Sequence, residues 1–185
     1  MKDNKNILKL DLHTHCFEAM RIPLPHLVTK DSVANIIASV SAKGLDGIAI
    51  TEHGDPNFGF KAREIASTYF SDETIIIIPG QEIYSHGIQI VELYLPNDTV
   101  FRFLPHPISI DRLDGDPVFN KIQGIEIDNY SHDRFINKQK VRDVAQKHNL
   151  LLLSNSDAHD LADIGGHYTE ISMDELFSRA TPPAH

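Results

Sequence analysis

The sequence contains one cysteine, Cys16, three methionines and no tryptophan among its 185 residues. A single cysteine excludes an intramolecular disulfide framework and any zinc module built mainly from thiolates. Apolar runs stay well below the roughly 20 residues that a membrane-spanning helix needs. We therefore expect a soluble, cytoplasmic protein that makes no membrane contact.

Positive charge is also scarce, with 17 Lys and Arg against 26 Asp and Glu and a formal net charge of -9. Non-specific binding to a polyanion draws on clustered cations, so a long nucleic acid is disfavoured as a partner and a small phosphorylated substrate is favoured. Internal repeats and Gly/Ser linkers are missing as well. We expect a single domain over residues 1–185, and the sequence leaves the oligomeric state open.

Strand-like and helix-like segments alternate along the chain. Short β-branched or alternating runs predict strands at residues 8–12, 46–51, 74–78, 88–95, 100–104, 124–127, 150–153 and 168–171. Helical spacing of apolar residues occurs between several of them, at residues 31–44, 61–70, 134–148 and 173–179. This alternation predicts a largely parallel sheet. A regular eight-fold barrel typically needs about 250 residues, so a smaller or irregular barrel, or an open sheet, fits this length better.

Histidines and carboxylates follow the ends of these predicted strands: His13, His15, Glu52, His53, Glu82, His106, Glu126, Asp157 and His159. In parallel α/β folds the carboxyl ends of the strands meet on one rim, where active sites form. The i, i+2 spacing of His13 with His15, and of Asp157 with His159, places each pair on one face of an extended chain. His106 lies between two prolines, and the second biases it towards an extended conformation.

Imidazole and carboxylate ligands without thiolate suit Zn, Mn or Fe. One ion would leave several of these residues unused, so we expect two or three divalent ions that share bridging carboxylates. A metal-bridging hydroxide would then serve as the nucleophile.

Several motifs together resemble the polymerase and histidinol phosphatase (PHP) domain family. They are His13-x-His15, Thr51–Glu52–His53, Pro79–Gly80–Gln81–Glu82–Ile83, His106–Pro107 and Ser156–Asp157–Ala158–His159. The resemblance spans about residues 10–165. It implies a distorted seven-stranded (β/α) barrel, mostly parallel, with a trinuclear metal centre that hydrolyses phosphate esters.

The resemblance also implies the ligands of each ion. The first ion would take His13, His15, Glu82 and Asp157, and the second would take His86 and His106 together with the bridging Glu82. The third would take His53, His159 and an acidic residue near the first motif. For that position we predict Glu18, with Asp55 as the weaker alternative. Catalytic roles are assigned to His53, Asp157 and His159, and Arg21 is the candidate for phosphate binding.

The sequence gives weaker indications for several other residues. Glu126 could orient a ligand histidine or be purely structural, and Cys16 is expected to be a packed thiol. His26, His132 and His167 lie in loop-like stretches and are expected to be exposed. Two other functions stay open: a non-catalytic metal-binding regulatory module, and carbon–nitrogen hydrolysis of the amidohydrolase type. The substrate itself is not determined by the sequence.

Overall fold

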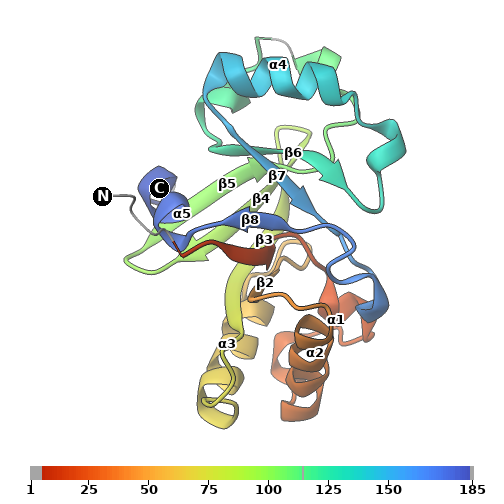
Figure 1. The fold of residues 1–185 in the computed structure, drawn as a ribbon, viewed down its shortest axis with the longest axis vertical. Coiled ribbons are helices and arrows are strands. Elements are labelled where there is room, and N and C mark those ends of the chain that lie inside the picture. Colours follow the sequence, from red (N-terminus) through yellow and green to blue (C-terminus); the bar gives the residue numbers. More distant parts are fainter. Residues whose placement is uncertain (1–5, 114, 184–185) are drawn as a thin grey trace.

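The computed structural model describes residues 6–113 and 115–183, which form a mixed α/β fold (Figure 1). The strands are β1 (Leu8–Asp11), β2 (Gly47–Ile50), β3 (Ile76–Ser85), β4 (Ile88–Leu95), β5 (Thr99–Leu104), β6 (Gly124–Asn129), β7 (Leu151–Asn155) and β8 (Thr169–Ile171). The α-helices are α1 (Cys16–Ala19), α2 (Lys30–Ala42), α3 (Asn57–Tyr69), α4 (Lys138–His148) and α5 (Met173–Arg179).

The described strands form one sheet in the order β7-β6-β5-β4-β3-β2-β1-β8. Neighbours joined through helices or long connections are parallel, namely β1–β2, β2–β3, β5–β6 and β6–β7. Tight turns join β3 to β4 and β4 to β5, so these pairs are antiparallel. The predicted barrel-like fold is confirmed, but it has eight strands where seven were expected. The eighth strand is the short β8, which pairs antiparallel with β1.

Side chains nearly close the sheet between its two edge strands. The Thr169 hydroxyl of β8 donates to the Ser154 carbonyl of β7 at 2.9 Å and accepts from the Ser154 N–H at 2.9 Å. The Asn155 side chain accepts the N–H of Leu12, just beyond β1, at 2.9 Å. Polar side chains thus replace the backbone ladder that a closed barrel would have here.

At the carboxyl ends of β1 and β7, backbone bonds continue this closure. The N–H of Asp157 donates to the His13 carbonyl, and the N–H of His15 donates to the Ala158 carbonyl, each at 2.9 Å. The segments after β1 and β7 therefore run side by side, although they lie more than 140 residues apart in the sequence. Both metal-ligand motifs of the sequence are brought together by this contact.

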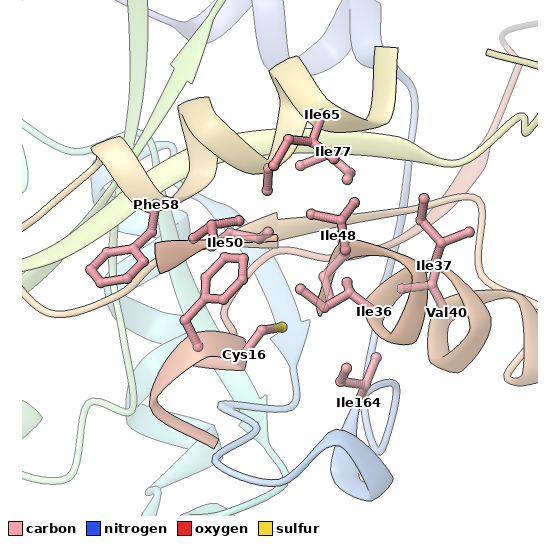
Figure 2. Packing of buried hydrophobic residues seen from close by; sticks show 14 of the residues in the cluster. Cys16, Ile36, Ile37, Val40, Ile48, Ile50, Phe58, Ile65, Ile77 and Ile164 are labelled. Atoms are coloured by element: carbon pink, nitrogen blue, oxygen red, sulfur yellow. The ribbon is translucent and has the colours of Figure 1, made fainter. Parts of the chain in front are cut away.

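Helices cover the sheet from opposite sides, with α2 and α3 at one end of the molecule and α4 at the other (Figure 1). Figure 2 shows the core under α2 and α3, where Ile36 and Val40 of α2 face Ile48 and Ile50 of β2. These side chains are fully buried, and each such burial contributes about 1.5–3 kcal/mol. This packing holds β2 in place, and the Thr51–Glu52–His53 motif follows directly after this strand.

The helices in the described part of the chain are all too short or too polar to cross a membrane.

Candidate metal centre

One rim of the barrel gathers a cluster of imidazoles and carboxylates. In four overlapping groups, the donor atoms of each group lie within 4.8 Å of one another. The rim cluster, as we call it, consists of His13, His15, Glu18, His53, Glu82, His106, His132, Asp157 and His159. It draws on the segments that follow β1, β2, β5, β6 and β7, and on Glu82 within β3.

Four of these residues, His13, His15, Glu82 and Asp157, form a central quartet. The His13 Nε2 atom lies 3.2 Å from His15 Nε2, 3.6 Å from Asp157 Oδ1 and 3.8 Å from Glu82 Oε2. His15 Nε2 lies 3.4 Å from Asp157 Oδ1 and 3.6 Å from Glu82 Oε2. Ligands about 2.1 Å from a tetrahedral ion lie about 3.4 Å apart. The five distances that involve the two imidazoles are therefore close to the spacing of ligands around one divalent cation.

Protonation of His13 is set by the fully buried Glu126. Glu126 Oε1 lies 3.0 Å from His13 Nδ1, so Nδ1 donates to this carboxylate and Nε2 is turned towards the quartet. Burial opposes protonation of His13, but Glu126 and the quartet carboxylates raise its pKa well above its usual value. Nε2 of His15 faces the same point, while its Nδ1 is buried without a hydrogen-bond partner among the described residues. Two imidazole nitrogens and two carboxylates thus face one buried point, and this is the donor set that a divalent cation takes in proteins.

The electrostatics of the rim cluster favour positive charge. Burial alone would raise the pKa of Glu82, but hydrogen bonds from His106, His13 and His53 hold it well below its usual value. Burial also opposes ionisation of Asp157, yet its bond to His15 and the nearby imidazoles lower its pKa to about 2. Burial lowers the pKa of His15 to about 4, so this imidazole is neutral. Ionised carboxylates and a neutral imidazole are the forms that bind metal.

Beside the quartet, an outer group combines His15, Glu18, His53 and His159. His53 Nδ1 lies 2.6 Å from Glu18 Oε1, and its Nε2 lies 3.1 Å from Glu82 Oε2. These two contacts, Glu82 first, raise the pKa of His53 to about 9 although burial opposes the shift. The side chains of His53 and His159 are 44% and 52% exposed, so the outer group faces solvent.

Glu52 positions Glu18 without entering the rim cluster. Its buried carboxylate accepts the N–H of Phe17 at 2.7 Å and that of Glu18 at 3.2 Å, at the N-terminus of α1. Carboxylates are favoured at helix N-termini because unpaired N–H groups point outward there. Glu18 thus lies where we predicted it. Asp55 instead accepts the N–H and side-chain amide of Asn57 at the start of α3.

On the other side of the quartet lie His106 and His132. His106 Nε2 is 3.2 Å from Glu82 Oε1, and its N–H donates to Glu126 at 2.7 Å. His132 Nε2 is 3.4 Å from Asp157 Oδ2, and its ring meets that of His106 edge-on at 4.9 Å. Glu82 and Asp157 thus each direct one oxygen into the quartet and the other towards this pair.

His86 does not join the rim cluster, in contrast to our prediction. It is exposed in the two-residue turn between β3 and β4, where His86 and Gly87 both have positive φ. Such a turn suits a tight hairpin, because its twist matches that of the two strands. β3 continues to Ser85 and pairs with β4, which carries His86 away from Glu82.

His132 is the residue that sequence reasoning missed, since we expected it to be exposed in a loop. β6 extends to Asn129, two residues beyond the predicted end, so His132 follows β6 as His159 follows β7. The strand-end rule would have identified it had the strand boundary been right.

Glu126 proves to be the residue that orients His13 and the His106 backbone. Arg21 is exposed, with φ of 56°, just beyond α1.

Comparisons with known proteins agree with this fold. Residues 135–179 match the family model described as PHP-associated. A presumed metal-dependent phosphoesterase from Bifidobacterium adolescentis superposes with a TM-score of 0.64 at 11% identity, covering 93% of this chain and 96% of its own. An amidohydrolase from Chromobacterium violaceum, with bound sulfate and no metal, gives 0.62 at 17% identity, covering 95% and 98%. PsfC from Pseudomonas syringae gives 0.63 at 13% identity, covering 95% and 89%. Among curated proteins, no significant sequence match is found.

Proposed function

We propose, from the premise that this chain is a PHP-family domain, that it is a metal-dependent hydrolase of small phosphate esters. The observation that carries the proposal is the central quartet, in which the two imidazoles lie 3.2 Å apart and each lies 3.4–3.8 Å from Glu82 and from Asp157. The three other rim groups support more than one ion. Zn, Mn and Fe all suit this donor set, and the chemistry of the ligands does not choose among them.

When bound, divalent ions lower the pKa of coordinated water towards neutrality and neutralise charge on phosphoryl oxygens. The quartet would hold the first ion. Glu82 and Asp157 present their second oxygens to His106 and His132, which would hold the second. Glu18, His53 and His159 would hold a third. The carboxylates of Glu82 and Asp157 would each serve more than one of these sites.

Residues of the solvent-facing outer group are placed to meet the substrate. His53 and His159 flank His15, with ring centroids 4.3 Å and 4.4 Å from it. As metal ligands they would hold positive charge close to the departing alcohol oxygen of the ester and so favour its release. Arg21, exposed next to the helix that carries Glu18, would contact the phosphate from the same side.

Carbon–nitrogen hydrolysis is the second candidate, because one structural neighbour is an amidohydrolase. The same donor set could activate water towards an amide carbon. Phosphate esters are favoured because the family resemblance extends through the motifs that contain His13, His15, His53, His106 and His159.

Both functions can be tested on one preparation. Protein stripped with a chelator is reloaded with Mn, Zn or Fe and assayed against phosphomonoesters, a dinucleotide and amides. We expect phosphomonoester hydrolysis that depends on metal and is abolished by Asp157→Ala. Glu170→Gln, an exposed carboxylate on β8, is the matched control and should retain activity. Hydrolysis of amides alone would favour the second candidate, and a protein inactive with every metal would contradict both.

A further inference from the structure

A cavity of about 320 Å³ lies directly beside the rim cluster. Its walls come from the β3–β4 hairpin and from the segment after β5, and include Tyr84, Ile88, Leu104, Pro107 and Ile108. Small-molecule sites are typically concave, mostly apolar and about 300–1,000 Å³ in volume. This cavity is at the lower end of that range, and because a cavity of about 150 Å³ already holds benzene, it has room for an aromatic ring with its substituents.

His106 connects the cavity with the rim cluster. The same side chain lines the cavity and places its Nε2 atom 3.2 Å from Glu82 Oε1. A group that occupies the cavity would therefore lie next to the second set of proposed metal ligands. A phosphate held at the rim and an organic group in the cavity can belong to one molecule.

Tyr84 is directed towards the same side as the metal ligands. It lies two residues beyond Glu82 on β3, so both side chains project from one face of the strand. Its side chain is 72% exposed, although tyrosine normally buries most of its ring. Ile108, on the opposite wall, is 46% exposed. Two large apolar side chains are thus left uncovered on either side of one cavity.

None of the residues that line the cavity is Lys, Arg, Asp or Glu. A charged amino group would therefore find no carboxylate there, and the polar side chains of the lining are limited to Tyr84, Gln89, His106 and Ser109. An uncharged apolar ring would bury its surface against Tyr84 and Ile108, and stacking on Tyr84 would add to this.

We infer that this cavity binds the alcohol part of the substrate, and that this part is an uncharged aromatic or similarly bulky apolar group. This inference rests on the proposed phosphoesterase function, since the rim cluster would hold the phosphate. Tyr84 and Ile108 are then residues that determine specificity without touching the reacting phosphorus.

The test combines binding with turnover. Benzylphosphonate and methylphosphonate, which lack a cleavable ester, are titrated calorimetrically into metal-loaded protein. Benzyl phosphate and glycerol phosphate, both esters of unactivated alcohols, are compared in hydrolysis. We expect benzylphosphonate to bind at least about 10-fold more tightly than methylphosphonate. Benzyl phosphate should have the lower KM of the two esters.

Tyr84→Ser and Ile108→Ser should each weaken benzylphosphonate binding about 2- to 10-fold and raise KM for benzyl phosphate alone. Values for methylphosphonate and glycerol phosphate should stay unchanged, as should kcat for benzyl phosphate. Tyr69→Ser is the matched control, since Tyr69 is a similarly exposed tyrosine on α3.

Each outcome separates the two proposals. Hydrolysis of both esters without preference, together with equal binding of both phosphonates, would overturn the cavity assignment and leave the phosphoesterase function intact. Selective benzylphosphonate binding without any ester hydrolysis would support the cavity and contradict the phosphoesterase function. Failure to bind either phosphonate, or unchanged preferences in both variants, would overturn the cavity assignment.

Discussion

Glu126 is the buried carboxylate on which the proposed metal centre depends most, and Glu126→Gln tests its role with little change in shape. Its Oε1 atom accepts from His13 Nδ1 at 3.0 Å and from the Asn155 amide at 2.9 Å. Its Oε2 atom accepts from the His106 N–H at 2.7 Å and from the Asn129 amide at 2.8 Å. All four partners donate, so only a group with two acceptor oxygens satisfies them.

Glutamine offers one oxygen and one NH2 group, so two of the four bonds must be lost whichever way its amide points. Hydrogen bonds to charged groups contribute about 1.5–3 kcal/mol each, which predicts a destabilisation of about 3–6 kcal/mol. If the NH2 group faces His13, the imidazole must move its hydrogen to Nε2 and can no longer bind metal. Substitution of such an orienting partner typically lowers metal affinity about 10- to 100-fold.

Urea denaturation of the chelator-treated protein measures the first effect, and competition for Zn or Mn against a calibrated chelator measures the second. Glu170→Gln serves as the control, because it makes the same chemical change at an exposed position of β8. If Glu126→Gln matched the wild-type protein in both stability and metal affinity, the reasoning about His13 would be refuted.

Three further predictions concern other parts of the structure. His132→Ala should lower the number of bound metal ions measured by mass spectrometry, whereas His86→Ala should not; the reverse result would restore His86 as the ligand. Thr169→Val should cost about 1–3 kcal/mol in urea denaturation, because both hydrogen bonds between the Thr169 hydroxyl and the Ser154 backbone are lost; an unchanged midpoint would contradict this. Burial opposes ionisation of Glu92, but hydrogen bonds including that from Arg102 lower its pKa. Its ionised form therefore stabilises the fold at neutral pH, and the deficit of Glu92→Gln should shrink as the pH falls through the acid range; a deficit independent of pH would refute this.

The strand-end pattern predicted most of the rim cluster because it depends only on local signals. His13, His15, Asp157 and His159 follow short apolar runs whose direction in a parallel fold is fixed by the helices between them. The positions of these ligands therefore required no knowledge of which strands pair. His86 and His132 were misplaced because their assignment depended on where β3 and β6 end. Strand boundaries follow from partner strands that a single sequence does not identify.

The contacts that close the barrel could not be predicted from local sequence patterns. Asp11 lies in the first strand, yet its carboxylate accepts the N–H groups of Ser156 and Gly165, from the far end of the chain. Burial raises the pKa of this carboxyl to about 6 in spite of those bonds. No sequence spacing reports such contacts, because they exist only once β1 and β7 lie together. The same contact sets the separation of His13 from Asp157, so the polar residues that close the barrel also determine the geometry of the quartet. An ion bound between these two residues would in turn join the first strand to the seventh.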